Sequence, residues 1–385
     1  ELLAGIWSEV LRLPRPHDID AEADFFALGG HSLRAAQVVA RIRDTLGPEL
    51  PLRALFEAPT VAALAARIEA ARRAAPVLPV PEIVRRPRAE HTLELPLSFA
   101  QQRLWFLEQM EPASARYHIP AALWLDGELD RAALRRAGAE IVRRHEVLRT
   151  TYRARDGRPV QVIQPLPQGG SAVPGPVVVE LAGLAPEERE AEARRLLARE
   201  AVRPFALAAE PPLRSALIRL DARRHALGLV FHHIAADGWS MGVVMRELRA
   251  LYEAFRQGRR SPLAEPAIQY ADFACWQRET LRGEVLEAQL AYWLERLAGA
   301  RPLELPTDRP RPAVRSPRGA VHSFLLPAEL PAALRRVGRA HGATLFMTLL
   351  AAFQGLLYRL TGQTDLAVGI PVANRDQARI EELIG

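Results

Sequence analysis

A proline-rich stretch, residues 75–96 (APVLPVPEIVRRPRAEHTLELP), separates two parts of the chain whose hydrophobic patterns differ. Its prolines favour an extended, semi-rigid connection over a packed element. The chain has 385 residues, which is long enough for two or three domains. We therefore expect one domain before residue 75 and another after residue 96.

The part before this stretch has the spacing of short amphipathic helices. Apolar residues recur at helical intervals in 6–13, 32–47 and 61–73, and Gly47 followed by Pro48 is a helix stop. The pattern predicts a small all-α bundle over residues 1–74.

The part after it mixes strand and helix patterns. Residues 121–126, 226–231 and 366–373 read as strands, the last two as buried ones. Asp130 and Ser240 each stand where a helix N-cap is expected, and Gly258 can end the second of these helices. The prediction is an α+β domain with a sizeable core.

Composition excludes several classes of protein. The sequence has one cysteine, Cys275, so neither an internal disulfide nor a cysteine metal cluster can form. It lies in an aromatic segment, which favours packing over a role as nucleophile. No apolar run approaches the roughly 20 residues that span a membrane, and no secretory signal is visible. We expect a reduced, cytoplasmic protein without a metal site or a membrane partner.

The basic charge does not indicate nucleic acid. All 51 basic residues are arginine, and the formal net charge is +6. The arginines alternate with acids along helical segments such as 187–195, as on a solvated helix face. No nucleic-acid-binding motif accompanies them, so we expect no nucleic-acid partner.

The first chemical signal is DFFALGGHSL, residues 24–33, in which Gly29 and Gly30 precede Ser32 at a helix start. The free N–H groups there suit a phosphate-bearing attachment. The alternative is that Ser32 is only an N-cap. A hydrolase nucleophile elbow is excluded, because the glycine that should follow the serine is missing.

The second signal is HHIAADGWS, residues 232–240. Side chains alternate along a strand, so only one of His232 and His233 can face a given cavity, which argues against both binding one metal. Either the pair is packed in a loop, or one histidine works as an acid or base. Asp237 can close the loop, and the N–H of Gly238 can meet a developing oxyanion.

Both signals resemble one family of enzymes. Residues 24–33 resemble the core motif of peptidyl carrier domains of nonribosomal peptide synthetases. HHIAADG resembles the active-site motif of the condensation domains of the same synthetases. Four further segments match the latter in order: SFAQQRLWFL (98–107), RHEVLRT (144–150), YADFACWQ (270–277) and GIPVANR (369–375).

The resemblance implies a fold and a division into domains. Residues 1–74 would be a four-helix carrier bundle with a slightly truncated N-terminus, and 75–96 the proline-rich linker. Residues 97–385 would be a two-lobed condensation domain, similar in fold to chloramphenicol acetyltransferase. Its second lobe would be incomplete, so that the fragment itself can be inactive.

The resemblance also implies residue roles. Ser32 would carry 4′-phosphopantetheine, and His233 would be catalytic, either taking the proton of the attacking amine or positioning that amine. His232, Asp237 and Gly238 would support the motif, with Asp237 paired to Arg375. The partners would be a phosphopantetheinyl transferase, an acceptor carrier domain and an adenylation domain.

Three related activities compete with peptide-bond formation. Heterocyclisation domains replace the histidine pair with aspartates, which argues against them here. Epimerisation domains share the histidines, but their carriers usually have aspartate where His31 stands. Non-catalytic recruitment domains of this fold usually have degraded histidine motifs. The intact motif and His31 favour condensation.

Overall fold

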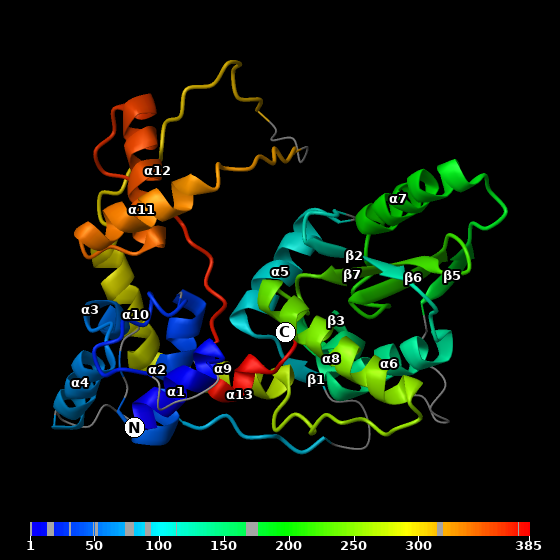
Figure 1. Ribbon diagram of the computed structural model, residues 1–385, viewed down its shortest axis with the longest axis horizontal. Coiled ribbons are helices and arrows are strands. Elements are labelled where there is room, and N and C mark those ends of the chain that lie inside the picture. The colour runs from blue at the N-terminus through cyan, green and yellow to red at the C-terminus, as the bar shows by residue number, and fades with distance from the viewer. Residues whose placement is uncertain are drawn as a thin grey trace. The chain divides into compact units, whose positions relative to one another are not determined.

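The computed structural model describes most of the chain (Figure 1). The described residues are 2–13, 19–30, 32–48, 50, 53–73, 81–88, 94–112, 114–166, 176–313, 319–375 and 377–385. They fall into two compact units, one of Glu1–Glu22, Ser32–Arg282 and Ala373–Gly385, the other of Ala23–His31 and Gly283–Val372. His31 and half of 75–96 lie outside the described residues, so the predicted linker is described only over 81–88 and 94–96.

Helices make up the regular structure described before residue 74. They are α1 (Leu2–Leu11), α2 (Ser32–Leu46), α3 (Arg53–Glu57) and α4 (Val61–Arg73). Trp7, Ile42 and Leu64 are fully buried, as the amphipathic spacing requires. The all-α prediction is confirmed. Helix α3 was not predicted because five residues are too few to show a helical period.

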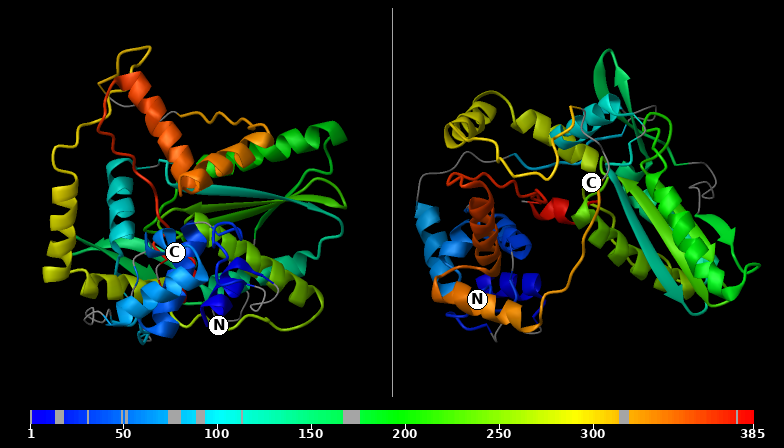
Figure 2. Two further views of the ribbon diagram at one scale, coloured as in Figure 1. Left: turned by 60° about the vertical axis from the view of Figure 1, so that its left-hand side comes forward. Right: turned by 90° about the horizontal axis from the view of Figure 1, so that it is seen from above.

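A four-stranded sheet is the centre of the first unit. Its strands are β2 (His118–Asp126), β7 (Arg224–His232), β6 (Leu213–Arg219) and β5 (Val177–Glu180), in that order, with β5 parallel to β6 and the other pairs antiparallel. Helix α7 (Pro186–Val202) covers one face, while α6 (Arg131–Arg144) and α8 (Gly238–Arg256) cover the other (Figures 1 and 2). The strands predicted over 121–126 and 226–231 lie within β2 and β7.

Glycine at position 228 allows α7 to approach the sheet closely. A Cβ there would lie 2.4 Å from Leu197 Cδ2 of α7. The approach places α7 directly over β7, so the strand is buried by helices on both faces.

A smaller sheet lies beside the start of α5 (Phe99–Met110). It consists of β1 (Glu94–Pro96), β4 (Arg158–Ile163) and β3 (Thr150–Arg155) in that order. Ser98 Oγ caps α5 by accepting from Gln101 N, and the Gln101 side chain accepts from Ser98 N. This capping box fixes Gln101, whose side chain enters the core and is 1% exposed.

Helix α8 begins differently from the prediction. Its N-cap is Asp237, whose Oδ1 accepts from Ser240 N at 2.7 Å, and Ser240 is the third helical residue. The predicted cap at Ser240 is therefore wrong: the helix begins three residues earlier, because the Asp237 carboxylate accepts from a free N–H of its first turn. Asp130 does cap α6, accepting from Ala133 N at 2.9 Å. Gly258, with φ +70°, follows the end of α8.

A buried charged cluster joins α6 to α8. Arg144 donates two hydrogen bonds to the Glu247 carboxylate, at 3.1 and 3.0 Å, and His145 Nε2 lies 3.1 Å from it. Burial raises the pKa of Glu247, but the hydrogen bonds from His145 and Arg144 outweigh it and lower that pKa to about 2. The carboxylate is thus ionised and fixes the two helices against each other.

Residues 81–88 have no regular secondary structure, yet they pack closely. The Ile83 side chain is fully buried. Arg88 forms ion pairs of 2.8 Å with Glu146, in η2 (Glu146–Arg149), and with Asp272, in α9 (Tyr270–Thr280). The expectation of a connection without regular secondary structure agrees with 81–88, but the expectation that it is not packed is wrong there. The cause is the apolar and arginine side chains between the prolines.

Helices form most of the regular secondary structure of the second unit. Residues 283–372 contain α10 (Gly283–Arg296), α11 (Glu329–Ala340) and α12 (Leu345–Thr361), and α13 (Ala378–Glu381) follows in the first unit. Among the described helices, no single one has the length and hydropathy to cross a membrane. By those two measures alone, α11 and α12 qualify together as a pair bent by 96°.

Residues 366–373 do not form the predicted buried strand. The segment is irregular, and Ile370 and Val372 are 48% and 77% exposed. A strand needs a neighbour to pair its backbone N–H and C=O groups. No strand in the described part of the chain pairs with this segment. The apolar run alone therefore gave a wrong prediction.

Candidate functional site

The two adjacent histidines have opposite environments. His232 ends β7, pairs with His118 of β2 and is fully buried. His233 follows the strand and is exposed. No side chain in the described residues hydrogen-bonds to the His233 imidazole, which leaves its ring nitrogens available to a substrate.

The backbone that carries His233 is held by hydrogen bonds on several sides. His233 N donates to Tyr117 O at 2.7 Å, and Ala235 N donates to His232 O at 3.0 Å. Ile234 N donates to His232 Nδ1 at 3.0 Å, and Gln101 Nε2 donates to Ile234 O at 3.3 Å. The loop is therefore a rigid support for an exposed imidazole, which is what positioning of a reacting group requires.

Asp237 is occupied mainly by the start of α8. Its Oδ1 accepts from both Ser240 N and Ser240 Oγ, at 2.7 and 2.6 Å. Arg375 Nη2 lies 3.5 Å from the same oxygen, and Arg375 Nη1 donates to Ile380 O at 2.8 Å. The structure thus brings Asp237 and Arg375 together, with the arginine buried among backbone carbonyls.

Gly238 begins α8 and leaves open space beside the loop. A Cβ added at Gly238 would meet no atom within 4 Å. In the described residues no acceptor takes its N–H, as expected for the first residue of a helix. An unpaired N–H at a helix N-terminus favours negative charge on a nearby atom.

The predicted attachment site lies at the start of α2. Gly29 has φ +93°, and a Cβ on Gly30 would lie 2.3 Å from two atoms of the Phe25 ring, so only glycine fits this close approach. Ser32 opens a helix of 15 residues with no acidic residue in its first turn. The residues therefore fit the attachment of a phosphate-bearing group at this helix start.

Cys275 is not suited to act as a nucleophile. It lies in α9, is 4% exposed, and burial raises the pKa of its thiol. A raised pKa lowers the thiolate fraction, so the packing role predicted from the sequence is favoured.

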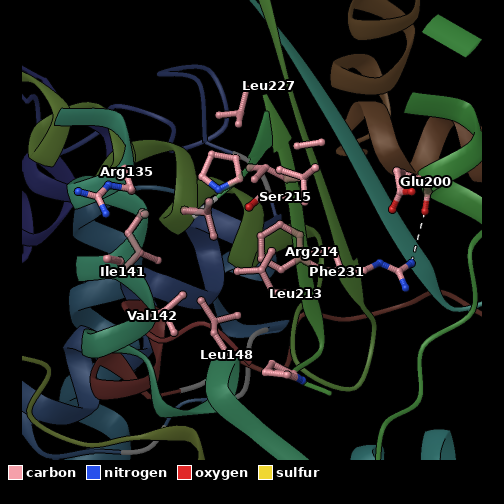
Figure 3. Close-up of a pocket in the computed structure, with 18 of the residues that line it drawn as sticks. Arg135, Ile141, Val142, Leu148, Glu200, Leu213, Arg214, Ser215, Leu227 and Phe231 are labelled. Atoms are coloured by element: carbon pink, nitrogen blue, oxygen red, sulfur yellow. Dashed lines mark hydrogen bonds between the residues drawn. The ribbon is translucent and has the colours of Figure 1, made fainter. Parts of the chain in front are cut away.

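A cavity of about 590 Å³ lies beside the sheet, separate from the histidine loop. Figure 3 shows Ile141, Val142 and Leu148 on one side of it, facing Leu213 and Phe231. None of the predicted site residues lines it. The cavity is therefore not the site that the sequence motifs indicate.

Comparison with known proteins agrees with these features. Residues 92–385 match the Condensation domain family, and residues 1–68 match the Phosphopantetheine attachment site family. The chain belongs to the condensation domain family. One of the linear gramicidin synthase proteins of Brevibacillus parabrevis is 49% identical over 392 residues, which cover 100% of this chain and 5% of that protein.

Two solved structures resemble the chain in fold and sequence. The X-domain from teicoplanin biosynthesis, in its complex with OxyB, has a TM-score of 0.68 and 32% identity over 80% of this chain and 66% of its own. The first condensation domain of the CDA synthetase has a TM-score of 0.62 and 29% identity over 76% and 68%. These matches confirm the predicted fold, a carrier followed by a condensation domain resembling chloramphenicol acetyltransferase. The match of residues 1–68 to the Phosphopantetheine attachment site family supports the predicted cofactor, covalent 4′-phosphopantetheine.

The sequence did not reveal how this condensation domain supports its histidine. Gln101 and Tyr117 bond directly to the backbone of the loop, and Glu108 of α5 lies beside the His232 ring. Gln101 and Glu108 lie in or next to the segment 98–107 that carries the resemblance. The available signal was the pair of polar residues on the same face of α5 as the buried Leu104.

Proposed function

We propose that residues 1–74 are a peptidyl carrier and residues 97–385 a peptide-bond-forming condensation domain, joined by 75–96, in a cytoplasmic nonribosomal peptide synthetase. A phosphopantetheinyl transferase modifies Ser32. When attached, the phosphopantetheine thiol holds an aminoacyl or peptidyl group as a thioester. An acceptor carrier domain, loaded by an adenylation domain, supplies the attacking amine.

The observation that carries this proposal is the exposed imidazole of His233, on a loop held by several hydrogen bonds and followed five residues later by the unpaired N–H of Gly238. Attack of the amine forms a C–N bond and breaks the C–S bond of the donor. His233 orients the amine, takes the proton it loses and returns it to the departing sulfur. The Gly238 N–H stabilises negative charge on the carbonyl oxygen during attack.

Loading of the carrier is the first test. The protein is incubated with coenzyme A and a broad-specificity phosphopantetheinyl transferase, and the added mass is located by peptide mass spectrometry. We expect modification at Ser32 and none in Ser32→Ala. An unmodified but helical wild-type protein would remove the carrier assignment.

Catalysis is tested in a complete synthetase that contains this chain. We expect His233→Ala to lower the rate of peptide-bond formation by about 100-fold or more, the usual contribution of a proton-transfer group. Arg195→Ala, at an exposed position on α7, is the matched control. A rate within a few-fold of wild type in His233→Ala would exclude a central role for this histidine.

A second candidate is recruitment of a partner enzyme without catalysis. It is favoured by the likeness to an X-domain whose structure was solved in complex with OxyB. A recruitment domain would leave peptide-bond formation unchanged in His233→Ala and would bind a partner enzyme in a pull-down. The same variant therefore distinguishes the two candidates.

A further inference from the structure

A buried carboxylate faces the ring of the inner histidine. Glu108, in the last turn of α5, is 7% exposed, and its Oε2 lies 3.6 Å from His232 Nε2. Acidic side chains are rarely buried to this extent without an interaction that offsets their lost hydration. The distance is longer than a hydrogen bond, so a direct action of this side chain on the ring would be electrostatic.

A hydrogen bond on the other side of the same ring shows which tautomer is present. Ile234 N donates to His232 Nδ1, so this nitrogen carries a lone pair and the ring proton stands on Nε2, toward Glu108. Burial, followed by the charges of His118 and His233, lowers the pKa of His232 to about 3. The ring is therefore neutral at physiological pH, and its contact with Glu108 is not an ion pair.

The aromatic neighbours of His232 pack against its ring but do not determine which ring nitrogen bears the proton. The rings of His118 and Phe205 pack against it edge-on, with centroids 6.0 and 5.9 Å away. His118 Nδ1 donates to Ala201 O at 2.8 Å, which directs its own proton away from His232. Packing therefore places the ring plane, while the proton positions are set by Glu108 and Ile234.

We propose that Glu108 is a positioning residue for His233. Its carboxylate keeps the His232 proton on Nε2, the free Nδ1 then holds the Ile234 N–H, and this bond fixes the backbone from which His233 projects. Without the carboxylate, a proton on Nδ1 would face the Ile234 N–H and open the turn. The effect on catalysis rests on the proposed function, whereas the effect on the ring does not.

The first measurement needs no substrate. Nitrogen NMR of the wild-type protein labelled at histidine, with His232→Gln for assignment, reports which ring nitrogen bears the proton. We expect His232 as the Nε2–H tautomer. If wild-type His232 bears its proton on Nδ1, the proposal is wrong, whatever the variants do.

The second measurement removes the carboxylate. In Glu108→Leu we expect Nδ1–H to appear at His232 and the Ile234 amide to exchange at least about tenfold faster. In Glu108→Gln the amide oxygen still faces the ring, so both signals stay near wild type. Glu111→Gln, exposed at the end of the same helix, is the control. A folded Glu108→Leu with wild-type tautomer and exchange would overturn the proposal.

The third measurement links the ring to catalysis in a complete synthetase. We expect Glu108→Leu to lower kcat for peptide-bond formation about tenfold with KM for the acceptor carrier unchanged, and Glu108→Gln to restore most of it. An unchanged kcat in a variant whose tautomer has shifted would overturn the catalytic part. Absence of activity in the wild type would instead contradict the proposed function and leave the ring measurements to decide.

Discussion

Strand β7 and residues 366–373 differ in what lies beside them. Strand β7 runs between β2 and β6, and eight of its nine residues are buried. Residues 366–373 have no paired strand in the described part of the chain, and Val372 is among the most exposed apolar side chains. Backbone pairing and side-chain burial thus occur together in one region and are both missing in the other.

Amide hydrogen exchange should show the largest contrast between the two regions. The backbone amides of β7 are paired with strands on both sides, so they exchange only when the surrounding core unfolds. The amides of 366–373 are paired with no strand in the described part of the chain, so they exchange without unfolding of the core. We expect exchange on the order of a thousandfold or more slower in β7, measured by mass spectrometry of peptides. Similar protection from exchange in the two regions would show that 366–373 is hydrogen-bonded in solution and would contradict the difference described here.

Truncation of one apolar side chain in each region gives the next largest effect. Phe231 is 1% exposed in the core, so Phe231→Ala should cost about 3–5 kcal/mol of the free energy of unfolding. Val372→Ala, at an exposed position, should change it by about 0.5 kcal/mol or less. Denaturant unfolding followed by circular dichroism gives both values. A large cost for Val372→Ala would contradict the exposed position.

Acid should weaken the α6–α8 contact behind β7. The pKa of Glu247 is about 2 in the folded protein, below its ordinary value of about 4.3, so the folded state binds fewer protons there. Its contribution to stability is complete above about pH 5 and is lost as the pH falls toward 2. Glu247→Gln should flatten the pH dependence of unfolding in this window. An unchanged slope in the variant would show that other carboxylates cause it.

The segment 81–88 is a useful intermediate case, because it lacks regular secondary structure, as 366–373 does, yet its side chains are packed, as those of β7 are. Arg88→Ala would leave Asp272, whose side chain is fully buried, without its cation, at a cost of roughly 2–3 kcal/mol given the partial exposure of the arginine. Arg86 pairs with Glu279 at the surface, so Arg86→Ala should cost about 1 kcal/mol or less. Unfolding midpoints of the two variants provide the check. Equal costs would mean that the segment is not packed as described.

The sequence predicted secondary structure correctly where the local hydrophobic pattern and a sequence motif agree. The apolar run before His232 predicted β7, and the spacing after Asp237 predicted α8, because both depend on residues close in sequence. Alternation along a strand does not explain the contrast between the histidines, because β7 is buried on both faces; His232 ends the strand, whereas His233 follows it in the exposed turn. The bonds from Gln101 and Tyr117 to the loop were not predictable, since they depend on how α5 and β2 meet β7. The same dependence on distant partners explains the wrong strand at 366–373.

The packing of residues 81–88 has a consequence for the carrier as a tethered ligand. Eight peptide steps separate the end of α4 at Arg73 from Pro81, whose carbonyl accepts a hydrogen bond from the Trp276 indole. Even fully extended, these steps reach only about 28 Å. A carrier restricted to such a radius has an effective concentration in the millimolar range. On the proposed function, weak binding of the carrier to the condensation domain would then suffice to deliver the thioester. The carrier would also dissociate rapidly after each transfer.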